Sequence, residues 1–323
     1  MSGNVTGRSL NIDRGVSGIL KFLCCLLIAL HHFALHHPDV TASSMFLQMI
    51  ATQGGYLGVG VYFFLSGYGL TRSWSNRPLT FGKFITRRLV RVYLPAVLIS
   101  LIWIVVIFVL NTKGFHVSDR NRSLDVCSLP AALLNVLALN FHDYILWFVG
   151  VILLLYLSFF AYKKIAVRWQ AVAAFVLCLA AVILLTNSAI GSFATISIPL
   201  FAVGVFVAEK SDWIGEHLVP FAAVSLAAIL LAGFILRHDM LMVHAAINFA
   251  AIWLVVVLLT VFNVSLRLPK WVGEVSFDVY LTHNKVILVA EALMLSQSLV
   301  VFLVCTAAVA ALSFGLRKLL RLS

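Results

Sequence analysis

Two ionisable residues of the first long apolar segment, Lys21 and His32, lie eleven positions apart. At about 100° per residue, an α-helix returns these positions to within roughly 20° of one face. A neutral imidazole can take a proton from an attacking hydroxyl and return it to a leaving group. A lone histidine can instead specify helix packing, but the alignment with Lys21 favours chemistry, since ionisable side chains in apolar segments are costly. His31 points away from this stripe and His36 lies one turn beyond it, so we expect both to line an entrance or face headgroups.

A second set of polar residues lies in the apolar segment 272–294. Spacings of four and three predict that Ser276, Tyr280 and His283 share one helical face. By helix rise, this histidine lies about 18 Å into its segment, a depth similar to that of His32. A further polar stripe on the segment consists of Glu274, Asp278 and Lys285. A catalytic role and a packing role are equally open for His283.

Three arginines cluster within about one helical turn of the segment Phe81 to Pro95: Arg87, Arg88 and Arg91. Planar guanidinium groups bind phosphate through two parallel hydrogen bonds, which suits the phosphates of a cytosolic donor such as coenzyme A. Basic runs beside a membrane span also set topology or contact anionic lipid. Charge alone therefore favours a role in topology or lipid contact over donor binding.

The composition predicts an integral membrane protein. Hydrophobic residues make up 62% of the 323 residues, only 11% are charged, and the mean hydropathy is +1.05. A chain this poor in charge could not cover a water-facing surface. The net charge of +11 fits basic cytoplasmic loops better than nucleic-acid binding. The five cysteines show no metal or redox spacing, and we expect no metal and no nucleic-acid partner.

An all-α fold with about ten membrane-spanning helices is expected. The predicted spans are 16–37, 54–71, 92–110, 145–162, 170–187, 189–208, 217–236, 241–262, 272–294 and 298–316. Residues 126–141 are too short to cross and are interpreted as interfacial or re-entrant. Alternate loops carry most Lys and Arg, which predicts cytoplasmic N- and C-termini. We expect residues 1–323 to form one membrane domain with no soluble domain appended.

Three other features of the spans have a packing interpretation and a functional one. Small residues such as Ser66 and Gly67 most often permit close helix packing, which is favoured over a nucleophilic serine. Trp147 and Phe148 could stack on a sugar ring, although an aromatic belt at the membrane interface is favoured. Pro199 breaks its span, and the side chains expected to satisfy the freed backbone groups are those of Ser192, Thr195 and Ser197.

Several short motifs, taken together, resemble the membrane acyltransferase-3 family. They are Arg14-Gly15, Lys21-x10-His32, the segment Gly58 to Tyr68 that includes Ser66-Gly67, Arg87-Arg88-x-x-Arg91-x-x-x-Pro95, Leu146-Trp147-Phe148, and the segment Ser276 to His283. Each motif is weak alone, but their order and spacing agree over nearly the whole chain. The chain departs from the family in carrying Lys21 where arginine is common. It also lacks the acidic Glu-Glu-Gln pattern of one branch.

The resemblance implies transfer of an acyl group, usually acetyl from cytosolic acetyl-CoA, to a hydroxyl of a surface carbohydrate. Carried over by position, His32 is the essential histidine and Lys21 its basic companion. Residues implied on the donor side are Arg14, Arg87, Arg88 and Arg91. Residues implied in the site wall or beside the acceptor are Ser66, Gly67, Trp147, Tyr280 and His283. The expected partners are acyl-CoA as co-substrate, a carbohydrate or glycolipid acceptor and lipid of the plasma membrane, with no permanently bound cofactor.

Two other classes of function fit the same polar residues. A proton-coupled carrier or lipid-linked-sugar permease would use His32, His283, Glu274 and Asp278 as proton or substrate sites. No repeat pairs the first five spans with the last five, which weighs against it. A non-catalytic partner in glycan assembly would keep its activity without His32.

Overall fold

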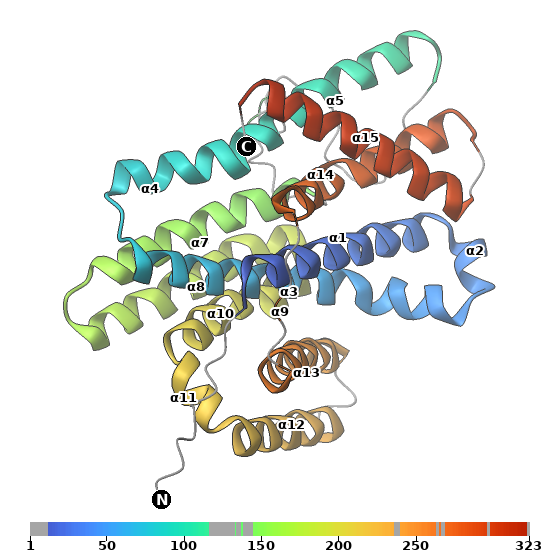
Figure 1. The fold of residues 1–323 in the computed structure, drawn as a ribbon. Helices are drawn as coiled ribbons and strands as arrows, with labels where there is room; N and C mark the ends of the chain where they lie inside the picture. Colours follow the sequence, from blue (N-terminus) through green and yellow to red (C-terminus); the bar gives the residue numbers. More distant parts are fainter. Residues whose placement is uncertain are drawn as a thin grey trace, which may run out of the picture. The chain divides into compact units, whose positions relative to one another are not determined.

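The computed structural model of the chain is built from helices, and the residues that it describes include no strand (Figure 1). The described residues are 12–115, 133, 137, 145–235, 240–262, 265, 269–295 and 298–321. The helices are α1 (Arg14–His36), α2 (Pro38–Ala42), α3 (Met45–Asn76), α4 (Phe81–Arg88), the π-helix η1 (Leu89–Tyr93), α5 (Leu94–Thr112), α7 (Leu146–Lys164), α8 (Arg168–Ile190), α9 (Ser192–Ser197), α10 (Pro199–Glu209), α11 (Ser211–Glu216), α12 (Leu218–Ile235), α13 (Met240–Val261), α14 (Lys270–Ala292) and α15 (Leu299–Leu319). This confirms the predicted all-α class.

Six helical stretches of the described chain are long and apolar enough to cross a membrane, so the chain is a multi-pass membrane protein. They are Arg14–His36, Phe81–Thr112, Leu146–Lys164, Arg168–Asn187, Leu241–Val261 and Leu299–Leu319. The predicted span 54–71 lies within α3, and the predicted span 272–294 overlaps α14, which ends at Ala292. Helix α14 carries the polar stripes that lower its hydropathy. Ten spans, cytoplasmic termini and a single domain stay predictions. The segment 126–141 lies outside the described residues except for 133 and 137.

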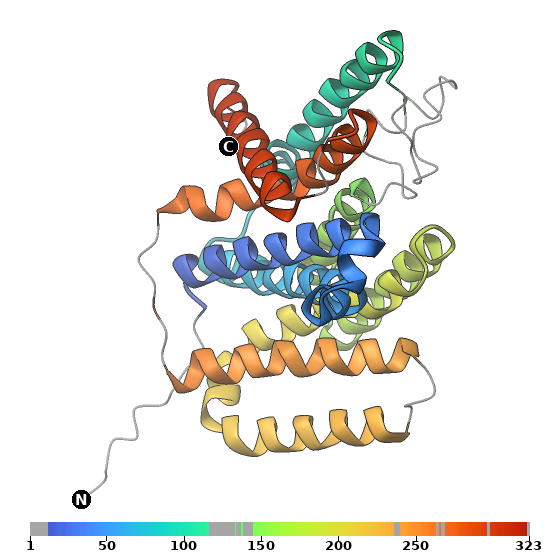
Figure 2. The same cartoon turned by 90° about the vertical axis from the view of Figure 1, so that its right-hand side faces the viewer.

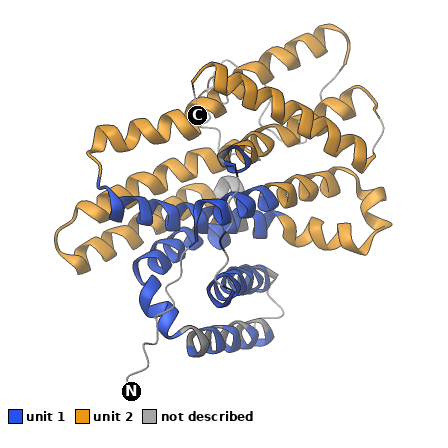
Figure 3. Cartoon of the chain, viewed as in Figure 1, with its two compact units in different colours: residues 1–24, 55–78, 195–273 blue, residues 25–54, 79–194, 274–323 orange. Residues whose placement is uncertain are grey.

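Contacts between residues divide the chain into two compact units, each assembled from three separate stretches of sequence (Figure 3). Unit 1 comprises Met1–Cys24, Gly55–Pro78 and Thr195–Gly273, and unit 2 comprises Cys25–Gly54, Leu79–Ala194 and Glu274–Ser323. Within unit 1, α12 and α13 lie side by side along their length (Figures 1 and 2). Within unit 2, α7 and α8 pack together in the same way. Each unit therefore depends on contacts between residues that are far apart in the sequence.

Pro199 ends the helix that the sequence predicts over 189–208. The structure has α9 before it and α10 after it, because proline lacks the backbone N–H and clashes with the preceding turn. The Phe201 N–H donates to the Ile198 carbonyl at 3.1 Å, which tightens the first turn of α10. The expectation for Ser197 is wrong, since its buried hydroxyl makes no hydrogen bond. Backbone contacts rather than this hydroxyl shape the break.

Two glycines bring α3 and α10 together inside unit 1. A Cβ added to Gly67 would collide with the Phe201 carbonyl oxygen, and one added to Gly204 would collide with that of Phe64. Each glycine therefore lies directly against the backbone of the other helix. This is the close packing that small residues permit in membrane helices.

Exchanging Gly67 for alanine will test this contact. We expect Gly67→Ala to lower the free energy of unfolding by about 1–3 kcal/mol, because one methyl group must push the α10 backbone away. Gly69 is the matched control on the same helix, since nothing lies within 4 Å of a Cβ added there. Gly69→Ala should be neutral or stabilise by up to about 1 kcal/mol through helix propensity. Thermal unfolding in detergent micelles measures both, and equal effects would contradict the packing argument.

Candidate functional site

The imidazole rings of His32 and His283 form a contact inside unit 2. Their centroids are 5.1 Å apart and their planes are inclined by 41°. His32 comes from α1 and is partly buried, whereas His283 comes from α14 and is fully buried. The similar depths expected for the two residues agree with this contact. The structure therefore brings two proton-accepting groups from distant parts of the chain into one place.

The α14 backbone holds the His283 ring in one tautomer. Its Nδ1 lies 3.0 Å from the Val279 carbonyl oxygen, and because a carbonyl can only accept, Nδ1 is the protonated nitrogen. Nε2 is then left with its lone pair, and this atom is buried without a hydrogen-bond partner. Tyr280 lies beside it, with ring centroids 6.0 Å apart, and its hydroxyl donates to the Ile145 carbonyl at 2.8 Å. His283 is thus a rigidly held base.

The two histidines that flank His32 on α1 have different partners. His31 is buried, and its Nδ1 donates to the Ile50 carbonyl at 3.1 Å. The expectation that His31 lines an entrance or faces headgroups is therefore wrong, because a position on the buried face of α1 gives it a backbone partner. The His36 Nδ1 lies 3.0 Å from Glu291 Oε1. This pair joins the end of α1 to the end of α14.

Trp147 and Phe148, at the start of α7, are each only 5% exposed. The aromatic-belt interpretation is wrong for them, because belt residues lie on the outer surface of a membrane protein. The Phe148 ring packs against Tyr280 at 5.3 Å and against Trp147 at 6.2 Å between centroids. The Trp-Phe pair thus supports the tyrosine beside His283.

A π-helical turn separates the basic helix α4 from α5. Pro95 has no N–H to donate to the Arg91 carbonyl four residues before it, so the regular ladder cannot continue through this point. The Leu94 N–H instead donates to the Leu89 carbonyl, which is the spacing of a π-helix. Such wide turns are rare and often occur at functional sites. Arg91 therefore lies in the π-helical turn, whereas Arg87 and Arg88 lie in the regular helix α4.

The three arginines differ in their surroundings within unit 2. Arg87 and Arg91 are exposed, whereas Arg88 is partly buried. The Arg88 guanidinium lies over the rings of Tyr156, at 5.1 Å, and Phe84, at 5.5 Å. Cation–π contacts of this kind hold the side chain against α7. A ligand can therefore be bound by Arg87 and Arg91, whereas Arg88 would first have to give up its cation–π contacts.

The remaining candidates belong to unit 1 and are described within it. Arg14 is exposed at the first turn of α1, and Lys21 is partly buried further along that helix. Lys21 is about 16 Å of helix rise from His32, so the two side chains do not touch. On α3, Ser66 is partly buried and Gly67 is the buried residue that packs on α10.

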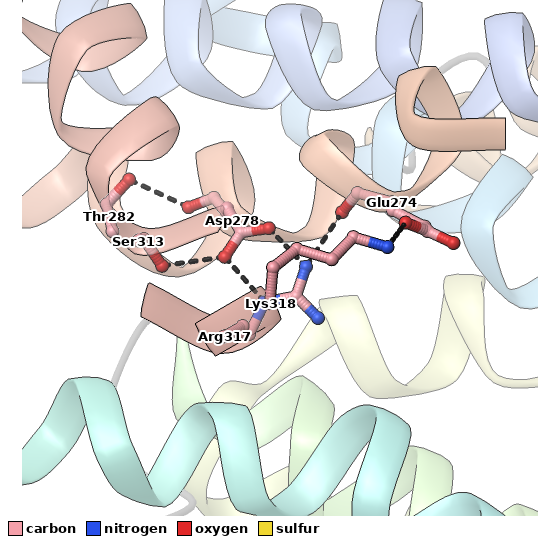
Figure 4. A network of polar contacts seen from close by, with 6 residues as sticks. All are labelled: Glu274, Asp278, Thr282, Ser313, Arg317 and Lys318. Carbon is pink, nitrogen blue, oxygen red and sulfur yellow. Dashed lines mark hydrogen bonds and ion pairs between the residues drawn. The ribbon is translucent and has the colours of Figure 1, made fainter. Parts of the chain in front are cut away.

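A buried ion pair joins α14 to α15 within unit 2 (Figure 4). Asp278 is fully buried and is bound by Arg317 and by the Ser313 hydroxyl, the latter at 2.6 Å. At the edge of this network, Lys318 binds the Glu274 carboxylate at 2.8 Å. The predicted span 298–316 ends just before Arg317, and the signal that could identify this residue is its spacing of four from Ser313 on one helical face.

Lys285, in the second polar stripe of α14, lies against α5 rather than α15. Its Nζ is 5.3 Å from the centroid of the Trp103 ring. Trp103 also packs with Ile107 and Leu288 in one apolar cluster. Within the described residues, no group of three or more His, Cys, Asp or Glu is placed to hold a metal ion.

Comparison with known proteins gives one match. A model of the acyltransferase-3 family, described as an acyltransferase domain, matches residues 16–318 and covers nearly the whole chain. The matched range includes both histidines and the Arg87–Arg91 segment, and Arg14 lies just outside it. No curated protein and no solved structure matches the chain. The match names an acyltransferase and no substrate.

Removing one partner of the buried ion pair will destabilise the protein. We expect Arg317→Met to cost about 3–5 kcal/mol of unfolding free energy, because it leaves the Asp278 carboxylate buried and unpaired. Lys318→Met is the matched control, since that ammonium is half exposed and its pair contributes about 0–1 kcal/mol. Removing both charges with Asp278→Leu in the Arg317→Met background should recover much of the loss. Thermal unfolding in detergent measures all three, and an Arg317→Met protein as stable as Lys318→Met would refute the assignment.

Proposed function

Because the chain belongs to the acyltransferase-3 family, we propose that it transfers an acyl group from cytosolic acyl-CoA to a hydroxyl of a carbohydrate. In this proposal the acyl group is acetyl, and the acceptor is a cell-surface or lipid-linked carbohydrate at the plasma membrane. The observation that supports it most directly is the contact between His32 and His283. Acyl transfer to a hydroxyl needs a base at the reacting oxygen, and two neighbouring imidazoles supply one.

His32 is the general base of the proposed reaction. It takes the proton of the acceptor hydroxyl while the hydroxyl oxygen attacks the thioester carbonyl carbon. A C–O bond forms, the C–S bond breaks, and the imidazolium returns the proton to the leaving thiolate. His283 acts beside it, since the two imidazole rings are in contact and the His283 Nε2 keeps a lone pair that can accept a proton. A covalent acyl-histidine is the alternative route through the same residue.

The donor approaches from the arginine end of unit 2. Arg88 rests on Tyr156, and the Tyr280 hydroxyl beside His283 is bonded to Ile145. Eleven residues of helix rise, about 16 Å, separate these two points along α7. The nucleotide phosphates of acetyl-CoA bind Arg87 and Arg91 in this proposal, and its long thioester arm spans the distance to the histidines. The donor-side role that the resemblance implies for Arg14 and Lys21, which belong to unit 1, stays a prediction.

A carrier is the second candidate function. The break between α9 and α10 at Pro199 favours it, because broken helices line substrate sites in transporters. The ion pairs of Asp278 with Arg317 and of Glu274 with Lys318 weigh against it, because paired carboxylates are poor proton sites. We therefore favour acyl transfer. The assays below separate it from transport and from a non-catalytic role in glycan assembly.

The first assay tests the base. His32→Gln should lower kcat/KM for acetyl transfer by about 10²-fold or more, the usual contribution of a general acid–base. His31→Asn is the matched control, because its amide can still donate to the Ile50 carbonyl. Transfer of labelled acetyl from acetyl-CoA to alkyl glycosides and lipid-linked sugars measures both. Full activity of His32→Gln would point to a non-catalytic role, and a wild type that binds no donor and labels no acceptor would refute the proposal.

The second assay tests the phosphate site. The double variant Arg87→Gln, Arg91→Gln should raise KM for acetyl-CoA by about tenfold or more per lost charged hydrogen bond, and leave acceptor KM unchanged. S-acetylpantetheine lacks the nucleotide phosphates, so its use should be the same in variant and wild type. Lys113→Gln, an exposed cation at the far end of α5, is the control for general loss of charge. Equal losses with both donors would mean misfolding or lost lipid contacts.

A further inference from the structure

A cavity of about 350 Å³ lies within unit 2, between the ends of α1 and α14 and the start of α15. Its wall includes Phe33, His37, Ile287, Glu291, Phe302 and Cys305. The volume is within the range of pockets that hold small organic ligands. The polar and apolar parts of this wall indicate what such a ligand is.

Two residues in the cavity wall are close sequence neighbours of His32 and His283. Phe33 directly follows His32 on α1, and Ile287 is one turn beyond His283 on α14. Both side chains belong to one apolar cluster with Phe302. Part of the cavity wall is therefore formed by residues that lie within about one helical turn of the two histidines along their helices. The cavity is also at the end of α1 opposite to Lys21.

Polar groups of the cavity suit a ligand with hydroxyl groups. His37 is only 7% exposed, and its Nδ1 is buried without a hydrogen-bond partner. Glu291 binds His36 through one carboxylate oxygen, and its side chain is 27% exposed. A buried imidazole nitrogen without a partner is costly, and a ligand hydroxyl would satisfy it. The Glu291 carboxylate accepts further hydroxyl hydrogen bonds.

The rest of the wall suits a hydrocarbon chain. The Phe33 and Phe302 rings stack with centroids 5.1 Å apart. Met294, Leu295 and Val301 also line the cavity, and all three are exposed on the surface of the protein. In a membrane protein, exposed apolar side chains of this kind face lipid. The rim of the cavity is therefore apolar, which suits the hydrocarbon chain of a ligand that comes from the membrane.

We propose that this cavity binds an amphiphile with a hydroxyl-bearing head and a hydrocarbon chain, and that this amphiphile is the acyl acceptor. Its head binds His37 and Glu291, and its chain lies along Phe302 toward the opening. One hydroxyl of the head then reaches His32. The binding site stands on the cavity alone, whereas the identification of its ligand as the acceptor rests on the proposed acyl transfer.

Cysteine labelling tests the binding site without any donor or turnover. Cys305 lines the cavity, and Cys178 on α8 is a partly buried free cysteine outside it. The protein in phosphatidylcholine nanodiscs is pulsed with N-ethylmaleimide, and modification of each cysteine is quantified by mass spectrometry. At ten times its Kd, n-decyl β-D-glucoside should slow the labelling of Cys305 by about tenfold through occupancy. The labelling of Cys178 should not change.

Two comparison ligands decide which part of the amphiphile is recognised. Decane should protect Cys305 much less than the glucoside, because it brings no hydroxyl to His37. Equal protection by decane would overturn the proposal. Protection by decanoyl-CoA and not by the glucoside would also overturn it, because the cavity would then bind the acyl chain of the donor. Equal slowing at Cys178 would also overturn it, since that is a general effect on the bilayer.

A variant of His37 separates binding from chemistry. His37→Phe keeps a ring against Phe33 and removes the nitrogen, so glucoside protection should need about tenfold more ligand, the value of one hydrogen bond of 1.4 kcal/mol. His217→Phe, at an exposed histidine after α11, is the control and should behave as wild type. His32→Gln should retain full protection. A wild type that shows glucoside protection but transfers no acetyl group would count against the proposed function and leave the binding site standing.

Discussion

Hydrocarbon offers no hydrogen bonds, so a polar side chain inside this protein costs free energy unless it contacts another polar group of the chain or a ligand. Helix α14 shows this constraint most clearly. Its carboxylate at Asp278 binds Arg317 and Ser313 of α15, its tyrosine at 280 binds the backbone before α7, and its glutamate at 291 binds His36 of α1. The polar stripes that lower the hydropathy of α14 are the contacts that hold three neighbouring helices to it.

These contacts also fix the histidine pair. His283 lies between Asp278 and Glu291 on α14, so its ring is placed by bonds on both sides of it in the sequence. The carbonyl of Val279 then decides which ring nitrogen carries the proton. A base that is held in one tautomer needs little reorganisation when a proton arrives, which is the condition for electrostatic preorganisation.

Unit 2 has different chemistry at the two places where ligands are proposed to enter. The exposed guanidinium groups of Arg87 and Arg91 lie on α4 and on the π-helical turn, and they suit phosphate. The cavity beside Phe33 is mostly apolar, with an imidazole and a carboxylate in its wall, and it suits an amphiphile. The histidine pair lies between a water-soluble donor and a membrane-borne acceptor in this arrangement. Such a separation keeps each ligand in the solvent that dissolves it.

The sequence by itself determined the membrane class, the helical fold and the positions of most helices, because apolar runs of spanning length have few alternatives in lipid. It also predicted site roles for His32 and the arginine segment from spacing, which is a local property of one helix. Only the tertiary structure decided the partners: Asp278 with Arg317, His31 with Ile50, and Phe148 with Tyr280. Helical periodicity gives the face on which a side chain lies but not the helix that packs there. That choice depends on contacts between segments far apart in the chain, and so the ring contact of His32 with His283 became visible only in the fold.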